Sequence, residues 1–308
     1  MHAHRTLSTM APRRRWHACL LGVAAIVTGQ AGIAQARLPR PDHIVIVIEE
    51  NKGYGQIIGS RNAPFINELA AQGASFSRFF AAHHPSQPNY IELFSGSDQG
   101  VKNDEIPRRP FTVPSLGGAL IRARLTFAGY AEDLPRPGAL EAFYPENRPT
   151  YARKHCPWID FADVPAAASQ PLTSFPARYE ALPTVSFVIP NLINDMHNGR
   201  DPERIRRADT WLHDRLSGYA QWCRRHNSLL IVTWDEDNHY WWNRTANHIP
   251  TVMVGAMVKP GVYNTSYNHH DLLRTIETMY GLPLLAGSRT ARAIDGCWQP
   301  APPAPAHR

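Results

Sequence analysis

Apolar strands that alternate with helical segments constrain this fold more than any other feature of the sequence. Residues 43–51 (HIVIVIEEN) and 228–237 (SLLIVTWDED) each run from apolar residues directly into charged ones. Between such strands, residues 63–73 (APFINELAAQG) and 201–223 place apolar side chains at helical spacing. The alternation predicts an α/β fold with a mostly parallel central sheet and helices on both of its faces.

The other segments extend the same pattern. Further strands are expected in 74–84, in the second part of 115–133, in 184–199 and in 249–258. Further helices are expected in 89–97, in the first part of 115–133 and in 269–282. Residues 134–172 are rich in proline and lack periodicity, so they are expected to form a long loop that covers one end of the sheet.

Both ends of the chain are expected to lie outside the folded domain. Residues 1–36 combine a basic start, an apolar run and Ala34-Gln35-Ala36, which is typical of a secretory signal peptide cleaved after Ala36. The arginines also fit twin-arginine export. Residues 299–308 are rich in proline and are predicted to be disordered. The remainder, 37–298, is expected to form a single periplasmic or secreted domain without a stable membrane anchor, since it has no second long apolar run.

Charge and cysteine content narrow the possible partners. The chain has 32 Lys and Arg against 26 Asp and Glu, and residues 1–36 contain four arginines and no acid. The remaining net charge is +2 (28 minus 26), so no nucleic-acid partner is expected. The sequence leaves the oligomeric state and the disulfide pairing open. Of the three remaining cysteines we expect Cys156 to pair with Cys297, because Cys223 lies in a predicted helix.

Polar side chains follow several of the predicted strands at the point where each strand ends. In an open parallel sheet the carboxyl ends of the strands meet at one edge, where such sheets bind their ligands. The side chains expected to meet there, the last of them at the start of a following strand, are Glu50, Asn51, Ser86, Asn89, Asp195, His197, Asp235, Glu236 and His248.

This set of side chains is suited to binding metal ions. Carboxylate and amide oxygens suit hard cations, and imidazoles suit zinc. We therefore expect one or two divalent ions, with zinc, calcium, magnesium and manganese all open. A bound metal lowers the pKa of a neighbouring hydroxyl, so Ser86 is the candidate nucleophile. Pro85 and Pro88 restrict the backbone on either side of it.

Each of these residues alone also has an ordinary structural interpretation. Glu50 could be an exposed strand end, Ser86 a turn former, and 235–237 a solvated loop. Five further residues are expected to be structural rather than functional: His269, His270, Trp234, Trp241 and Trp242. The convergence of several polar strand ends at one sheet edge favours a shared metal site over separate explanations.

Several motifs of the chain occur in the order found in a known family. They are IVIVIEENKGY, APFINELAAQG, HHPSQPNYIELFSG, PNLINDMHNG, VTWDEDN, NHIPTVMVG and YNHHDLLRTIE, and they extend from about residue 42 to 283. Together they resemble the bacterial phosphoesterase family, which holds secreted acid phosphatases and phospholipase C-type enzymes within the alkaline-phosphatase-like superfamily. The resemblance implies a three-layer α/β/α fold with a metal site at the carboxyl edge of the sheet.

The resemblance also implies roles for individual residues. Glu50 and Asn51 match a metal-binding block after the first strand, and Asp235 and Glu236 match a later acidic pair that binds the same metal. Ser86 falls where the superfamily has a nucleophile that forms a covalent phospho-enzyme.

Other matched residues are expected to act beside the nucleophile. Asn89 matches an asparagine that holds a phosphoryl oxygen, and Asp195, His197 and His248 fall near the ligands of a second metal. The match is looser at these ligands, because NDMH differs in its acid-to-histidine spacing. Glu236 also stands where relatives have histidine, so the number of metals stays open.

Together these features predict a secreted, metal-dependent phosphoesterase that resembles an acid phosphatase. It is expected to hydrolyse phosphate esters through a phospho-Ser86 intermediate, with His197 or His248 assisting proton transfer. A phospholipase C or a small-substrate phosphodiesterase is the alternative among enzymes, and a non-catalytic phosphate-binding protein is the alternative of another class. A sulfatase is disfavoured, since neither C-x-P-x-R nor S-x-P-x-R surrounds Ser86.

Overall fold

A central eight-stranded sheet organises the computed structural model, which describes residues 1–2, 38–238 and 247–300. In spatial order its strands are β12 (Gly261–Tyr263), β2 (Ala74–Phe76), β11 (Thr251–Val254), β9 (Ser228–Trp234), β1 (His43–Glu49), β8 (Val185–Ile189), β4 (Phe127–Ala131) and β7 (Ser169–Pro171). All neighbours pair in parallel except β11, which is antiparallel to both β9 and β2. The expected α/β fold with a mostly parallel sheet is confirmed.

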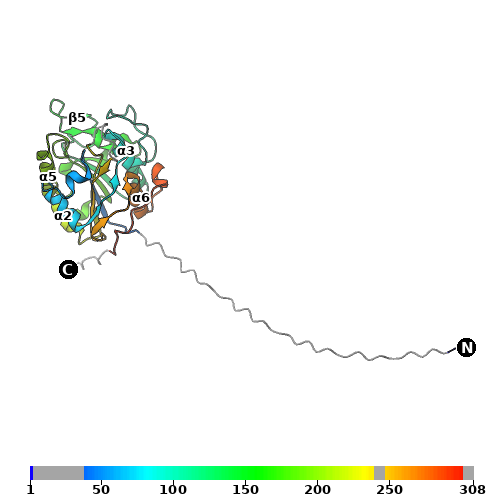
Figure 1. The fold of residues 1–308 in the computed structure, drawn as a ribbon. Helices are drawn as coiled ribbons and strands as arrows, with labels where there is room; N and C mark the ends of the chain where they lie inside the picture. Colours follow the sequence, from blue (N-terminus) through cyan, green and yellow to red (C-terminus); the bar gives the residue numbers. More distant parts are fainter. Residues whose placement is uncertain (3–37, 239–246, 301–308) are drawn as a thin grey trace. The chain divides into compact units, whose positions relative to one another are not determined.

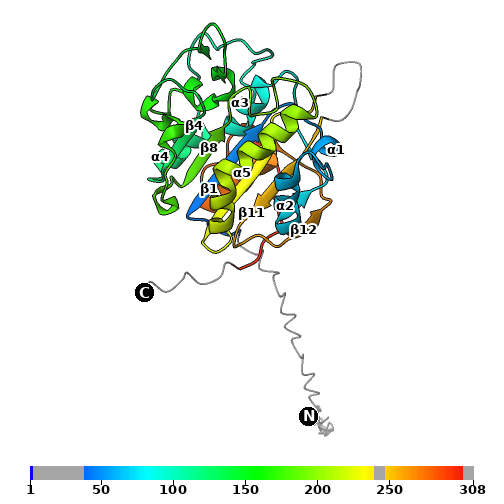
Figure 2. The ribbon, with the colours of Figure 1, turned by 90° about the vertical axis from the view of Figure 1, so that its left-hand side faces the viewer.

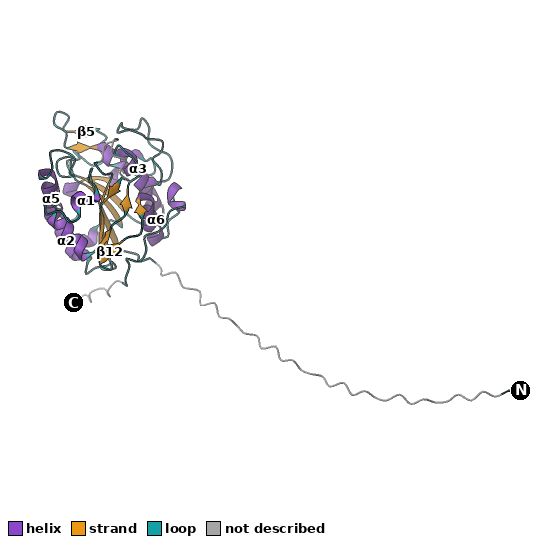
Figure 3. Ribbon diagram, in the orientation of Figure 1, coloured by secondary structure: helices purple, strands orange, loops and turns teal. Residues whose placement is uncertain are grey.

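Helices cover both faces of this sheet. On one face α2 (Pro64–Gln72) packs with α5 (Glu203–Cys223), and Figure 2 looks onto this face. On the other face α3 (Gln87–Ser95) packs with α6 (His269–Tyr280), and Figures 1 and 3 show the strands between the two helix pairs. The shorter helices are α1 (Tyr54–Ile57) and α4 (Leu116–Arg122). The arrangement is a three-layer α/β/α sandwich.

The central strand β1 is buried on both sides. Residues 44–48 are at most 2 % exposed, as expected for a continuous apolar run in a parallel sheet that is covered on both faces. β1 pairs in parallel with β9, in a register that sets Glu49 opposite Trp234. The polar residues that follow the two strands therefore emerge side by side at one edge of the sheet.

Two expected strands are interrupted in the structure. Segment 74–84 turns at Ser77, so its two halves join different sheets. Segment 249–258 is divided at Pro250, which has no amide hydrogen to donate to a strand ladder. The strands of the smaller sheets are β10 (His248–Ile249), β3 (Phe79–Phe80) and β13 (Tyr267–Asn268) in one, and β5 (Phe143–Tyr144) and β6 (Tyr151–Ala152) in the other.

The expected long loop at 134–172 contains more regular structure than its composition predicts. β5 and β6 form a hairpin, and Figure 1 shows β5 at the top of the folded domain. β7 adds an edge strand parallel to β4. Short 3₁₀ helices connect these strands and continue beyond them: η1 (Arg153–His155), η2 (Pro157–Asp160), η3 (Ala166–Ala168), η4 (Leu172–Ser174), η5 (Tyr179–Ala181) and, further along, η6 (Ala286–Arg289).

The expected Cys156–Cys297 disulfide is wrong for this structure, where Cys156, Cys223 and Cys297 are all buried free thiols. Cys156 follows η1 at the end of the sheet where β1 terminates, and its backbone amide donates to the Arg153 carbonyl. The Cys297 carbonyl accepts from Lys259 beyond β11, which runs antiparallel to β9. The two cysteines therefore lie toward opposite ends of the sheet.

Some expectations concern residues outside the described part of the chain. They are the signal peptide, of which residues 3–37 are not described, the tail from 301 to 308, and Trp241 and Trp242. Among the residues that are described, no helix combines the length and apolar character that crossing a bilayer requires.

A long-range cap at the start of α2 gives a test of the fold. Ala63 precedes this helix and offers no capping side chain, and the buried Asp209 of α5 takes that role. Its Oδ2 accepts from the Phe65 amide (3.0 Å) and its Oδ1 from the Ile66 amide (2.8 Å). The carboxylate thereby satisfies two helix donors and ties α2 to α5.

We expect Asp209→Ala to lower the free energy of unfolding by about 1–3 kcal/mol at neutral pH, because two buried amides lose their acceptor. Urea denaturation monitored by circular dichroism measures the change. Asp214→Ala on the same helix is the matched control, since the Asp214 side chain is 66 % exposed and, in the described part of the chain, pairs only with the exposed His213. Equal stability of the two variants would contradict the cap.

Candidate active site

The Ser86 side chain lies between two carboxylates at the edge of the sheet. Ser86 immediately precedes α3 and is buried. Its Oγ lies 2.9 Å from Glu236 Oε1 and 3.3 Å from Glu50 Oε2, so the hydroxyl can donate to either acid. Glu50 directly follows β1, and Glu236 is the second residue after β9. Three separate segments thus converge on one hydroxyl oxygen.

Backbone pairing beyond the strand ends holds the acids in place. The Asp235 amide donates to the Glu49 carbonyl (3.1 Å), and the Asn51 amide donates to Asp235 Oδ1 (3.1 Å). Asn51 takes a left-handed backbone conformation (φ 49°), which asparagine tolerates better than most residues, and its side-chain amide donates to Glu50 Oε2. The structure therefore brings Glu50, Asn51, Ser86, Asp235 and Glu236 together.

His155 joins this cluster from η1, in the segment that the sequence identified only as a loop. Its Nε2 lies 2.9 Å from Glu50 Oε1 and its Nδ1 lies 3.8 Å from Asp195 Oδ2. Its ring stacks on Tyr90, whose hydroxyl donates to Glu50 Oε1 (2.7 Å). Tyr90 belongs to the HHPSQPNY motif, whereas no periodicity or spacing marks His155.

These partners change the acidity of the buried carboxyl groups. Burial raises the pKa of Glu50, but the adjacent His155 and Lys154 outweigh burial and hold that pKa below its ordinary value. Burial, and then the Glu50 charge, raise the pKa values of Asp235 and Asp195. The neighbouring acids therefore repel one another, and Glu50 is the one whose charge the protein stabilises.

A second histidine lies at the exposed side of the cluster. His84 Nδ1 contacts Glu236 Oε2, and its Nε2 lies 3.7 Å from Asp237 Oδ1. The His84 side chain is 44 % exposed, whereas Glu236 is buried. Burial raises the pKa of Glu236, and the hydrogen bond from His84 opposes this effect. His84 thus connects the buried acids to the solvent.

Asn89 lies in the first turn of α3, and its side-chain amide is bonded to the backbone of the loop before Ser86. Its Oδ1 accepts from the amides of Ala82 (3.2 Å) and His83 (3.0 Å), and its Nδ2 donates to the His83 carbonyl (2.9 Å). Asn89 is 1 % exposed. It therefore holds the segment before Ser86, and a contact with a ligand would require Nδ2 to leave the His83 carbonyl.

The three residues expected near a second metal lie in two different places. Asp195 Oδ1 accepts from the His197 amide (2.7 Å), and the His197 ring centroid lies 6.4 Å from that of His155. His248 instead stacks on Tyr54 and directs its Nε2 toward the Ser77 carbonyl (2.9 Å). Asp195 and His197 border the cluster, and the contacts of His248 lie outside it.

The donor set of the cluster fits a hard divalent cation. Asp235 Oδ2 and Asp195 Oδ2 are buried and have no hydrogen-bond partner among the described residues. Carboxylate oxygens in this state are costly unless a proton or a cation neutralises them. In the part of the chain that the structure describes, no three His, Cys, Asp or Glu side chains already have the spacing of a metal cage. Contacts from Ser86, Tyr90 and His155 position the Glu50 carboxylate, and Ser86 also contacts Glu236.

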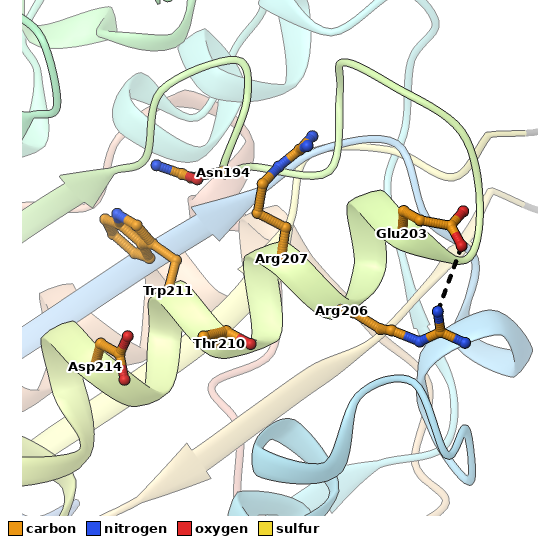
Figure 4. Close-up of a pocket in the computed structure, with 7 residues that line it drawn as sticks. All are labelled: Asn194, Glu203, Arg206, Arg207, Thr210, Trp211 and Asp214. Carbon is orange, nitrogen blue, oxygen red and sulfur yellow. Dashed lines mark hydrogen bonds and ion pairs between the residues drawn. The ribbon is translucent and has the colours of Figure 1, made fainter.

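A separate hollow of about 490 Å³ lies along α5 (Figure 4). Figure 4 shows Arg207 and Trp211 beside it, and both are engaged: Arg207 donates to the carbonyls of Ile193 and Asn198, and Trp211 Nε1 donates to Glu132. Its lining includes the Thr210 hydroxyl, but no hydrogen bond among the described residues joins this hydroxyl to Asp214 or Glu203. The hollow is therefore not the reactive site.

Comparisons with known proteins agree with this architecture. Residues 60–283 match the model of the phosphoesterase family. The chain is 46 % identical over 271 residues to a phosphatidylinositol-3-phosphatase of Mycobacterium tuberculosis, with 87 % of each chain covered. It is 29 % identical over 231 residues to a phosphate-repressible acid phosphatase of Penicillium chrysogenum, and this match covers 71 % of the present chain and 55 % of the fungal one.

Solved structures show the same fold at low sequence identity. A protein of the alkaline phosphatase superfamily from Vibrio parahaemolyticus matches with a TM-score of 0.58 and 11 % identity, covering 83 % of this chain and 71 % of that one. A phosphonate monoester hydrolase from Silicibacter pomeroyi matches with a TM-score of 0.54 and 14 % identity, covering 82 % and 76 %. The fold is therefore alkaline-phosphatase-like, as the sequence predicts.

The hydrogen bonds of Asn89 make its structural role testable. We expect Asn89→Ala to lower the free energy of unfolding by about 1–3 kcal/mol, because the Ala82 and His83 amides lose their acceptor and the His83 carbonyl keeps only its bond from Asn247. Urea denaturation measures the change. Asn103→Ala is the matched control, since Asn103 is exposed and its side chain bonds, among the described residues, only the nearby Glu105 amide. An Asn89→Ala protein as stable as the control would show that these bonds contribute little.

Proposed function

The chain belongs to the phosphoesterase family and is a hydrolase of phosphoric esters, and on this premise we propose that it is a metal-dependent phosphatase with Ser86 as its nucleophile. One observation carries the proposal: Ser86 Oγ lies within hydrogen-bond distance of the buried carboxylates of Glu50 and Glu236. A hydroxyl held between two bases, at the carboxyl edge of a parallel sheet, is positioned for nucleophilic attack.

In the first step Ser86 Oγ attacks phosphorus and the ester oxygen departs. An Oγ–P bond forms, the P–O bond to the leaving group breaks, and the hydroxyl proton passes by way of Glu236 Oε1, 2.9 Å away, to the departing ester oxygen. In the second step water attacks the phospho-Ser86 ester, which releases inorganic phosphate and regenerates the hydroxyl. His197 is better placed than His248 to move a proton here, because it borders Asp195 and His155.

Glu50, Asn51, Asp235 and Glu236 would hold the cation, and Asp195 is placed to contribute. When bound, a divalent cation supplies a Lewis acid that lowers the pKa of the serine hydroxyl and offsets charge on the phosphoryl group. His155 and Tyr90 keep Glu50 oriented toward this position through their contacts with Oε1. Asn89 fixes the loop on which Ser86 lies.

The relatives favour phosphomonoesters as the substrate class. The mycobacterial and fungal relatives are named as phosphatases, and the mycobacterial name specifies a phosphorylated inositol lipid. We take lipid phosphomonoesters as the leading candidates for this chain, and we also propose that the chain is exported, since residues 1–36 have the composition of a signal peptide.

We expect Ser86→Ala to lower the rate on p-nitrophenyl phosphate by at least roughly a thousandfold, since the nucleophile is lost. Ser97→Ala, on the loop after α3, is the control and should keep the wild-type rate. Mass spectrometry after acid quenching should detect phospho-Ser86 only in the proteins that retain Ser86. Full activity of Ser86→Ala would refute the nucleophile, and faster turnover of bis-p-nitrophenyl phosphate than of the monoester would favour the phosphodiesterase alternative.

Removal of the cation should abolish activity reversibly. We expect dialysis against a chelator to remove both the bound metal, measured by inductively coupled plasma mass spectrometry, and the hydrolysis of p-nitrophenyl phosphate. Asp235→Asn should reduce the bound metal independently of any activity measurement, because it removes a buried anionic ligand. Asp214→Asn, an exposed acid on α5, is the control. A purified wild-type protein that is active and metal-free would exclude metal dependence.

A further inference from the structure

The ammonium group of Lys154 lies beside the candidate active site and takes no part in the contacts among its acids. Lys154 belongs to η1 and directly precedes His155, whose Nε2 contacts Glu50. The Lys154 side chain is only 10 % exposed. Lysine is among the residues least often buried, so a specific role is expected for it at this position.

Asp104 connects Lys154 to the backbone next to Ser86. Its Oδ2 accepts from Lys154 Nζ (2.7 Å), and its Oδ1 accepts from the Gln87 amide (3.1 Å). Gln87 is the first residue of α3 and directly follows Ser86. A single carboxylate group therefore separates the ammonium from the backbone at the nucleophile. Lys154 is thus tied to the site twice, through its chain neighbour His155 and through Asp104.

The ammonium is close enough to the buried acids to affect their ionisation, yet it pairs with none of them. Among the described residues its only ion pair is with Asp104. Burial lowers the pKa of Lys154, but the charges of Glu50, Asp104 and Asp235 outweigh burial and raise it. The Lys154 charge in turn helps to hold the pKa of Glu50 below its ordinary value. The positive charge therefore acts on the acid cluster across a gap rather than through a contact.

Lys154 also has unused hydrogen-bonding capacity. A lysine ammonium carries three N–H donors. Asp104 accepts from one of them, and no other hydrogen bond of Nζ occurs within residues 38–238 and 247–300. Lysine binds phosphoryl oxygens through charge-assisted hydrogen bonds, in which it serves as a point charge. A phosphoryl group at Ser86 Oγ would thus have free donors on the Lys154 side of the site.

The charge of the substrate makes a cation at this place useful. A phosphomonoester carries about −1.5 to −2 charge at neutral pH, whereas a phosphodiester carries a single negative charge. Ser86 lies within hydrogen-bond distance of Glu50 and Glu236, and these carboxylates repel both kinds of ester. A fixed ammonium offsets the additional charge of the monoester, so it stabilises a bound monoester more than a bound diester.

The other buried lysine near the cluster is engaged elsewhere. Lys52 Nζ donates to the Asn51 carbonyl (2.9 Å) and lies 3.7 Å from Asp201 Oδ1. Burial lowers the pKa of Lys52 to about 8. The contacts of Lys52 hold the backbone at Asn51, so Lys154 is the lysine that is placed to meet a ligand.

From these observations we propose that Lys154 binds a phosphoryl oxygen of the substrate and makes the site selective for phosphomonoesters over phosphodiesters. Asp104 holds the ammonium near the start of α3 until the ester enters. This inference rests on the proposed function and adds to it the residue that selects the substrate class.

The test compares the two ester classes in Lys154→Gln, which removes the charge. We expect kcat/KM on p-nitrophenyl phosphate to fall by at least roughly tenfold, because a hydrogen bond from a charged donor to the substrate is lost. On bis-p-nitrophenyl phosphate kcat/KM should fall by no more than about threefold, because the diester has less charge to offset. Lys102→Gln is the matched control and should change neither value, since Lys102 is 70 % exposed and pairs with Asp98.

A binding measurement separates this contact from the chemical step. In the purified Ser86→Ala protein, isothermal titration calorimetry gives the affinity for inorganic phosphate. Adding Lys154→Gln should weaken this affinity by at least roughly tenfold. The bound metal, measured by inductively coupled plasma mass spectrometry, should not fall, and this result would exclude an indirect effect through Glu50 and Asp235.

Several outcomes would overturn the proposal. Equal losses on the two esters would assign Lys154 a structural role, and an unchanged monoester rate or phosphate affinity would remove the contact itself. Where the wild type cleaves no diester, the phosphate affinity alone decides. If Lys154→Gln does not fold, the charge-balanced pair Lys154→Gln with Asp104→Asn takes its place under the same criteria. Lys154-dependent phosphate binding by a wild-type protein that hydrolyses no ester would refute the proposed function and support the phosphate contact.

Discussion

The parallel register between β1 and β9 is the constraint on which the candidate site depends. Because Glu49 lies opposite Trp234, the next residues of both strands, Glu50 and Asp235, leave the sheet side by side. Backbone hydrogen bonds from Asp235 and Asn51 continue the pairing past the strand ends. Breaking these bonds would leave buried backbone groups unpaired, so the sheet holds the two carboxylates close in spite of their repulsion.

That repulsion explains the arrangement of the residues around the acids. Glu50 accepts from Tyr90, contacts His155 and lies within reach of the Ser86 hydroxyl, whereas Asp235 Oδ2 has no hydrogen-bond partner among the described residues. Burial and the Glu50 charge together raise the pKa of Asp235. The protein has therefore stabilised the charge of one acid and left its neighbour dependent on a proton or on the proposed cation. A site of this kind costs stability when it is empty, which is common where binding energy is used for chemistry.

Residues that a regular element positions could be predicted from the sequence, whereas residues that a loop positions could not. Glu50 and Asp235 could be predicted to meet because both follow apolar strands of one parallel sheet. His155 could not, because it belongs to a segment whose path is set by tertiary contacts such as the Arg153–Asp160 ion pair rather than by periodicity. The expected Cys156–Cys297 disulfide failed for the same reason, since cysteine spacing carries no information on which end of the sheet each thiol occupies.

The segment that was hardest to interpret from sequence connects the reactive centre to the molecular surface. It supplies His155 to Glu50, and earlier in the same segment it exposes Phe143 and Tyr144. Arg153 bonds to the Ala142 and Leu140 carbonyls, so it ties the residues before β6 to η1, which carries His155. In this superfamily fold the sheet determines which acids meet, and a loop is free to vary without disturbing them. The surroundings of the site can therefore adapt to lipid-held or soluble esters while the strand ends that carry the acids stay the same.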